Sequence, residues 1–452
     1  MSIVSQRSSA AAHVALYKER LRRNSFLRKV GVLSGGSALG HLFTLGAAPI
    51  LARIYGPGNF GRLGLFMSFL SVAGVAVALG FESSIVCGRD EGEAAYLTLA
   101  SLVLAVPMSL LAGAVLWLLI HYSLLGFGGL PRYTPWLVLV ALGCVGVFSA
   151  LRYWCVREDR FGSISRGLIV QSAARALFQT ALGLAGWHSV GLVIGETAGR
   201  GMGMSQMLRS AWPVLRRRLA EFDRHELMRA LWRNRKFPLF SMPSSFLDAL
   251  CIGLPVPLLV RLYGNAAGGF YSLVWRAVAV PSVLVTVAIA DTFHSRLATC
   301  ARETPDEVMG LFRRTSLSLL AVGGIPAVLL AAYSQPLFSA VFGPRWALSG
   351  AMAGMIAPWY LSQFVVAPVS RVVLVLSGQE MKLVWDIVCI CSLITLFVVA
   401  QRRGLAMLQT VRMLSFLNTA LYVVYFLILV RTVSRFQKMQ CPASMASVPD
   451  SF

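Results

Sequence analysis

The chain has 452 residues, of which 57% are hydrophobic and 13% charged, with a formal net charge of +22 and a mean hydropathy of +0.69. A soluble protein of this length does not bury so much apolar surface, so the composition excludes a soluble enzyme. The eight cysteines form no CxxC pair and have no neighbouring metal-ligand histidines. We therefore expect an integral membrane protein without disulfides, a metal site or a cofactor.

Apolar stretches long enough to span a bilayer, about 20 residues each, recur about twelve times. In chain order the expected spans are 29–51, 63–85, 94–121, 135–156, 164–185, 190–208, 238–260, 269–291, 315–333, 349–374, 381–400 and 405–430. Six spans in each half give both halves the same orientation. We predict an all-α membrane protein of about 12 transmembrane helices, in two six-helix bundles related by a pseudo-two-fold axis along the membrane normal, as in alternating-access transporters.

The charge pattern divides the chain further. The expected segments are a cytoplasmic N-terminal segment (1–28), the first bundle (29–208), a basic linker (209–236), the second bundle (237–436) and a tail (437–452). Most Lys and Arg fall on one side if both termini are cytoplasmic, as the positive-inside rule requires. The linker should contact anionic lipid headgroups. Because no stacking aromatics or fold motif accompany it, we do not expect nucleic acid as a partner.

One segment occurs twice, once in each half. Residues 49–56 (Pro-Ile-Leu-Ala-Arg-Ile-Tyr-Gly) return as residues 257–264 (Pro-Leu-Leu-Val-Arg-Leu-Tyr-Gly), and Gly61 corresponds to Gly269 in the same register. Each copy ends the first long apolar segment of its half. This repeat supports a duplicated membrane bundle, with a substrate site between the halves.

Charged side chains within spans are costly, roughly 2.5–3.5 kcal/mol each at the bilayer centre, so each needs a reason. Arg53 and Arg261 occupy equivalent outer ends of the first and seventh spans, where they could draw an anionic headgroup or anchor helix ends in lipid headgroups. Arg276, in the eighth span, could line the cavity or pair with a buried acid. Arg175 could line the cavity or form an ion pair between helices. Arg371 could line the cavity or snorkel to the cytoplasmic surface.

Four acids are candidates for ion coupling. Glu196 stands four residues before Arg200, which favours an ion pair on one helix beside a glycine-lined packing face, although Glu196 could also sense protons. Asp248 has no basic residue three or four positions away, so it could bind a cation, carry a proton, pair across helices or be solvated by nearby serines. Glu82 and Asp291 are further candidates near span ends.

Several motifs in order resemble one family. They are the segments 51–65 (Leu-Ala-Arg-Ile-Tyr-Gly-Pro-Gly-Asn-Phe-Gly-Arg-Leu-Gly-Leu), 81–86 (Phe-Glu-Ser-Ser-Ile-Val), 236–240 (Lys-Phe-Pro-Leu-Phe) and 342–346 (Phe-Gly-Pro-Arg-Trp). Their order and spacing resemble the Wzx-like oligosaccharide flippases of polysaccharide biosynthesis, in the superfamily that includes the MATE multidrug exporters. Asp248 and Asp291 stand where relatives often carry uncharged polar residues, which leaves the coupling chemistry open.

The resemblance implies two lobes that open alternately to each face of the bacterial inner membrane. The implied cargo is an oligosaccharide attached through pyrophosphate to a polyprenyl lipid, with a polysaccharide polymerase and export machinery as further partners. Guanidinium groups grip phosphate oxygens bidentately, so intramembrane arginines suit such a cargo.

Two alternatives remain. A MATE-type exporter of small cationic compounds predicts an acidic cavity, whereas the intramembrane arginines here match or outnumber the acids. A membrane polysaccharide polymerase or ligase predicts a large external loop and groups for general acid–base chemistry, and the expected external loops are short.

Overall fold

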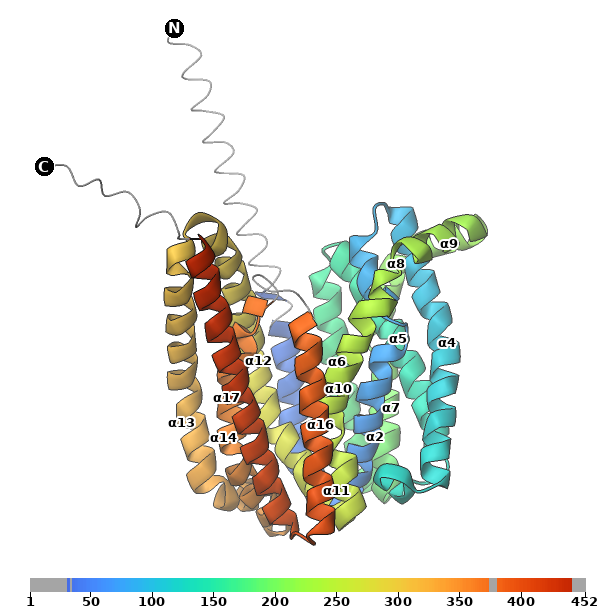
Figure 1. Ribbon diagram of the computed structural model, residues 1–452. Helices are drawn as coiled ribbons and strands as arrows, with labels where there is room; N and C mark the ends of the chain where they lie inside the picture. The colour runs from blue at the N-terminus through green and yellow to red at the C-terminus, as the bar shows by residue number, and fades with distance from the viewer. Residues whose placement is uncertain (1–30, 33–34, 374–379, 441–452) are drawn as a thin grey trace, which may run out of the picture.

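The computed structural model describes residues 31–32, 35–373 and 380–440, and this part of the chain is helical without strands (Figure 1). The first half contains the helix Gly35–Ile54, α2 (Pro57–Ala76), α3 (Phe81–Ser84), η1 (Ile85–Cys87), α4 (Glu91–His121), η2 (Leu124–Gly129), α5 (Thr134–Arg157), α6 (Phe161–Leu184) and α7 (His188–Gly201). α8 (Ser205–Ala220) and α9 (Arg224–Arg233) follow. The second half contains η3 (Phe237–Ser241), α10 (Met242–Gly253), α11 (Pro255–Tyr263), α12 (Asn265–Glu303), η4 (Pro305–Glu307), α13 (Val308–Phe342), η5 (Pro344–Trp346), α14 (Ala347–Val369), α16 (Glu380–Arg402) and α17 (Met407–Gln440).

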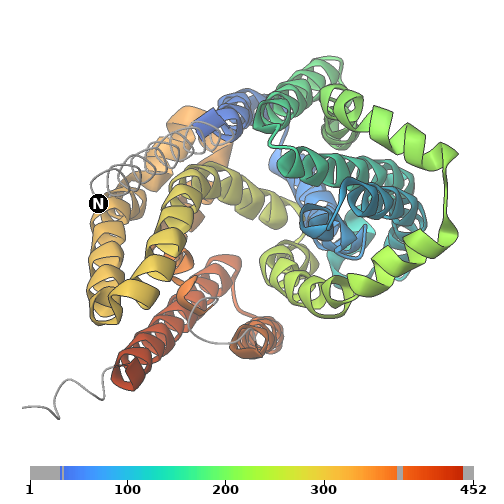
Figure 2. The same ribbon diagram turned by 90° about the horizontal axis from the view of Figure 1, so that it is seen from above.

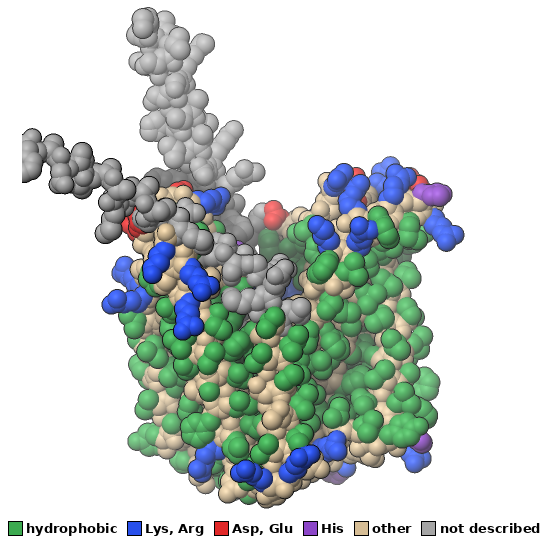
Figure 3. Space-filling model, viewed as in Figure 1, with side chains coloured by type: hydrophobic (Ala, Val, Ile, Leu, Met, Phe, Trp, Pro, Cys, Tyr) green, Lys and Arg blue, Asp and Glu red, His purple; other side chains and the backbone are tan. Residues whose placement is uncertain are grey.

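The protein is a multi-pass membrane protein. Nine helices among the described residues are long and apolar enough to cross a bilayer. Figure 3 shows hydrophobic side chains as a broad belt around the visible face, with Lys and Arg at its two edges. α6, α7 and α12 run alongside these helices (Figure 1) and correspond to the remaining expected spans. The prediction of two symmetric six-helix bundles stays a prediction.

The linker is helical and rests on the first half. α8 begins at Ser205, so helical structure continues across the expected boundary after residue 208. Oε2 of Glu93, on α4, forms an ion pair with Nη1 of Arg233 at 3.2 Å. Oε1 of Glu93 accepts a hydrogen bond from Nδ2 of Asn234 at 3.1 Å. Viewed from above, α8 and α9 run along the outside of the first half (Figure 2). We call the end of the molecule that carries α9 the linker end, and the opposite end the distal end.

A proline in the seventh expected span ties α10 to the first half. Pro257 has no N–H, so it cannot donate to the main-chain oxygen of Gly253 four residues earlier. The Ser68 hydroxyl of α2 donates to that oxygen instead. In a membrane a freed carbonyl must find a partner within the protein, so this bond holds α10 against α2.

At the distal end the two halves meet through the duplicated segments. A Cβ added at Gly61 of α2 would overlap the main-chain oxygen of Asn265, and a Cβ added at Gly269 of α12 would overlap that of Pro57. Pro57 and Asn265 correspond in the same register as Gly61 and Gly269. The crossing of α2 and α12 is therefore a symmetric backbone contact that only glycine permits.

A second contact reinforces the crossing. The Trp346 indole N–H donates to the main-chain oxygen of Ala52 at 2.9 Å, and the Arg345 guanidinium donates to that of Arg53 at 2.8 Å. Trp346 is fully buried, with its ring in edge contact with Phe60 of the first half and Phe270 of the second. These contacts close the distal end in this conformation.

We predict that Gly61→Ala and Gly269→Ala each weaken the distal closure, because a methyl group against backbone atoms costs about 1–3 kcal/mol when the helices cannot adjust. Spin labels at positions 133 and 403, in a cysteine-free background, report the separation of the two halves at this end. The expected result is a shift to longer distances. Gly143→Ala is the matched control, since a Cβ there meets no atom within 4 Å. Unchanged distances in both variants would contradict the closure.

Candidate functional site

The candidate site is built on two helices that pack closely through glycine. A Cβ added at Gly195 or Gly199 of α7 would collide with Gln179 or Arg175 of α6, respectively. The predicted glycine-lined packing face of α7 is thus confirmed. Because these glycines let the backbones approach, the polar side chains of α6 and α7 reach one another inside the first half.

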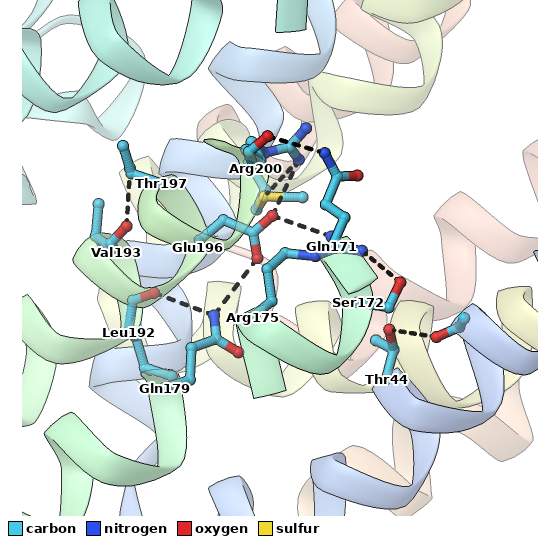
Figure 4. Close-up of polar contacts among 12 residues, drawn as sticks. Thr44, Gln171, Ser172, Arg175, Gln179, Leu192, Val193, Glu196, Thr197 and Arg200 are labelled. Carbon is cyan, nitrogen blue, oxygen red and sulfur yellow. Dashed lines mark hydrogen bonds and ion pairs between the residues drawn. The ribbon is translucent and has the colours of Figure 1, made fainter. Parts of the chain in front are cut away.

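Glu196 of α7 lies between two arginines (Figure 4). Its Oε1 lies 3.2 Å from Nη1 of Arg175 on α6 and 3.0 Å from Nη2 of Arg200. Only 3% of the Glu196 side chain is exposed, against 22% for Arg175 and 18% for Arg200. The predicted pair of Glu196 and Arg200 is confirmed, and Arg175 takes the interhelical pairing that its sequence left open.

Neutral side chains hold these charges in place. Gln179 donates to Oε2 of Glu196 at 3.4 Å, and Nη2 of Arg175 donates to the Ser172 hydroxyl at 3.1 Å. Nε of Arg175 and Nε of Arg200 are buried without a hydrogen-bond partner. The arrangement therefore keeps guanidinium donors that the protein itself does not satisfy.

Arg276 of α12, in the second half, lies near this group. Its charge lies within electrostatic range of Glu196, Arg175 and Arg200. Within the described part of the chain, Arg276 has no hydrogen bond or ion pair. We call these four residues the Glu196 cluster. Three guanidinium groups face one carboxylate, so the cluster carries an uncompensated positive charge where the two halves meet.

Asp248 lies elsewhere, in a cavity of about 310 Å³ within the second half. The Asp248 side chain is exposed to this cavity, whereas Asp386 of α16, which also lines it, is 5% exposed. Two carboxylates from different helices thus border one space. Such a pair can bind a cation or hydrogen-bond a polar ligand.

The structure does not bring the other candidates into the Glu196 cluster. Arg53 is exposed at the distal end, where its Nη2 lies 3.5 Å from the main-chain oxygen of Val341. Arg261 is exposed at the same end, and Arg371 is exposed just after α14. Their assignment to substrate binding stays a prediction. The side chain of Asp291, in α12, lies outside the described part of the chain.

Glu82 sits on the short helix α3, beyond the end of α2. Its Oε2 is buried without a hydrogen-bond partner, and burial raises the pKa of this carboxyl above its usual value. Gly80, two residues earlier, lies against Phe237 and Met242 at the start of the second half. Glu82 therefore lies near a junction of the two halves.

Sequence reasoning missed Gln179 and the aromatic lining of the second-half cavity. Gln179 follows Arg175 by four residues, so it shares a helix face with a residue already singled out, and that spacing could have found it. The aromatic lining comes from several helices and has no local spacing that marks it.

We predict that Glu196→Gln lowers the thermal stability of the purified protein. The change leaves two largely buried arginines without their counter-charge, a loss of about 3–5 kcal/mol for a buried pair. Glu221→Gln is the matched control, because Glu221 forms the same four-residue pair with Arg217 on the exposed face of α8 and should contribute little. Equal melting temperatures for the two variants would show that the buried pair does not stabilise the fold.

Three comparisons place the chain among known proteins. The model of the polysaccharide biosynthesis protein family matches residues 50–350. The succinoglycan biosynthesis transport protein ExoT of Rhizobium meliloti (strain 1021) is 25% identical over 374 residues, covering 79% of this chain and 70% of that protein.

Solved structures show the same fold. An inward-facing multidrug resistance MATE family transporter of the MOP superfamily superposes with a TM-score of 0.65 at 13% identity, covering 88% of this chain and 96% of that one. A MOP superfamily transporter from Pyrococcus furiosus superposes with a TM-score of 0.58 at 12% identity, covering 91% of this chain and 96% of that one. The chain thus belongs to the polysaccharide biosynthesis protein family, as a transporter with the MATE-type fold and not as an enzyme.

Proposed function

We propose that the protein flips polyprenyl-pyrophosphate-linked oligosaccharide from the inner to the outer leaflet of the bacterial cytoplasmic membrane, for O-antigen, capsule or exopolysaccharide synthesis. The observation that carries this proposal is the Glu196 cluster, with three arginines and one carboxylate where the two halves meet. An excess of guanidinium groups in a membrane requires an anion, and the cargo of the family supplies a pyrophosphate.

The cluster suits a phosphate ligand better than a carboxylate ligand. Arg276 has no partner within the described part of the chain, and Arg175 and Arg200 each retain an unsatisfied Nε. Guanidinium groups bind phosphate oxygens in forked pairs of charge-assisted hydrogen bonds. Glu196 would then position Arg175 and Arg200, while Arg276 approaches the pyrophosphate from the opposite half.

The contacts between the halves support alternating access. Under the positive-inside rule, the linker end with its basic α8 and α9 faces the cytoplasm, which puts both termini there. The Gly61–Gly269 crossing and the Trp346 contacts then close the outer end. A cargo would enter from the cytoplasmic side, and rocking that separates α2 from α12 would release it outside.

The rival reading is export of small cationic compounds. Organic cations require acidic or aromatic surroundings, and a cluster with excess arginine repels them. The two carboxylates of the second-half cavity are the observation in its favour. We therefore assign Asp248 to cation coupling, with a proton or sodium ion entering this cavity as the oligosaccharide leaves. Glu82, Glu196 and Asp291 remain candidates for the same role.

We predict that Arg276→Gln weakens binding of polyprenyl pyrophosphate by about ten- to a hundredfold, since a charged hydrogen bond contributes about 1.5–3 kcal/mol. The measurement is affinity for the purified protein in lipid nanodiscs, together with polymer export in cells. Arg314→Gln, an exposed position on α13, is the control. Normal affinity and normal export in the Arg276 variant would rule out this residue as a pyrophosphate ligand.

We predict that Asp248→Asn removes the dependence of transport on an imposed proton or sodium gradient. The amide cannot carry the negative charge that binds a cation. Proteoliposomes with each gradient in turn identify which ion is coupled, and Asp306→Asn, exposed and outside the cavity, serves as the control. A variant that still responds to the same gradient as the natural protein would exclude Asp248 as the coupling site.

A further inference from the structure

The second-half cavity has an aromatic wall that neither pyrophosphate binding nor cation coupling uses. Residues of α10, α12, α14, α16 and α17 line it, and five of these residues are Trp275, Trp359, Trp385, Tyr422 and Tyr425. Its volume of about 310 Å³ lies at the lower end of the range of small-molecule sites, roughly 300–1,000 Å³. The space therefore suits a small ring or two, and not a long chain.

The aromatic rings form two groups. Trp385 of α16 stacks on Tyr425 of α17, with centroids 4.9 Å apart and planes 20° from parallel. Trp275 of α12 and Trp359 of α14 lie 6.3 Å apart with planes tilted by 41°. Flat apolar faces of this kind, on several sides of one space, provide platforms for a ligand with a flat apolar face of its own.

One buried donor without a partner and one partly exposed amide accompany the rings. Nε1 of Trp359 is buried without a hydrogen-bond partner, and Trp359 is 7% exposed. Gln363, one turn further along α14, also lines the cavity and makes no hydrogen bond within the described part of the chain. A buried indole N–H normally finds an acceptor, so its lack of one points to a ligand that brings an acceptor.

We infer that this cavity binds a sugar ring of the lipid-linked oligosaccharide, an inference that rests on the proposed function. A pyranose has an apolar face that stacks on tryptophan or tyrosine, and its hydroxyls both donate and accept hydrogen bonds. The hydroxyls can accept from Trp359 Nε1 and from the Gln363 amide, and donate to Asp386 and Asp248. A sugar can therefore stack on the aromatic rings of the cavity and form hydrogen bonds with both its donors and its acceptors.

An organic cation is the competing ligand, because carboxylates and aromatic faces attract it too. A quaternary ammonium or phosphonium ion with only hydrocarbon substituents has no acceptor for the indole N–H of Trp359, which would stay buried and unsatisfied. A sugar hydroxyl provides that acceptor. The unsatisfied donor therefore favours the sugar over the cation.

The position of the cavity agrees with this assignment. Trp275 lines it, and the next residue on α12 is Arg276 of the Glu196 cluster. Consecutive residues of a helix point about 100° apart. A lipid-linked oligosaccharide whose pyrophosphate meets Arg276 would thus place a nearby sugar against Trp275, which makes the cavity a specificity site beside the pyrophosphate site.

The test compares two lipids on the full-length protein in nanodiscs: sugar-free polyprenyl pyrophosphate, and the lipid-linked repeat unit extracted from the native host. We expect Trp359→Phe, Gln363→Leu and Trp385→Leu each to weaken binding of the repeat unit about threefold to tenfold and to leave the sugar-free lipid unaffected. Trp136→Phe, on the exposed face of α5, is the matched control and should change neither.

Each other outcome overturns the inference in a recognisable way. Equal weakening of both lipids, or no weakening of either, would show that the cavity does not contact sugar while the pyrophosphate site stands. Tight binding of tetraphenylphosphonium that Trp359→Phe or Asp248→Asn weakens would make the cavity a site for organic cations. If the unaltered protein binds neither lipid, both the proposed function and the sugar site are wrong.

Discussion

The backbone contact between α2 and α12 is the constraint on which the rest of the structure depends. Gly61 and Gly269 let the two helices approach until main-chain atoms of each half touch the other. Because the contact has no side chains to rearrange, it is either made or broken, which suits a two-state element. Trp346 and Arg345 add hydrogen bonds that must also break before the distal end opens.

The positive charge of the Glu196 cluster is stabilised only in part. Glu196 stabilises Arg175 and Arg200, yet Arg276 approaches from the other half and leaves the cluster with more cations than anions. An excess of buried positive charge is unfavourable when the site is empty, and an anionic cargo would neutralise it. Under the proposed function this cluster binds the anionic cargo, while the second half holds a separate space with carboxylates and aromatic rings.

Local sequence patterns predicted much of this structure, but they did not predict the contacts between distant segments. Apolar runs located the helices, and the four-residue spacing predicted the pair of Glu196 and Arg200. The duplicated segment predicts equivalent places in the two halves, and its arginines suggest a binding role, but its glycines make the contact. A glycine reveals its role only beside its partner helix, about 200 residues away in this chain. The aromatic cavity likewise draws on five helices and has no pattern in the sequence.

The most direct test of the central claim is the location of the lipid-linked oligosaccharide in cells that lack this protein. Protease-free spheroplasts treated with a membrane-impermeant sugar-modifying reagent distinguish the two leaflets. A transporter of the complete unit predicts that unmodified, finished units accumulate on the cytoplasmic leaflet, and that restoring the natural protein returns them to the outer leaflet. Finished but unpolymerised units on the outer leaflet of the deletion strain would contradict the account, because translocation would then proceed without this protein.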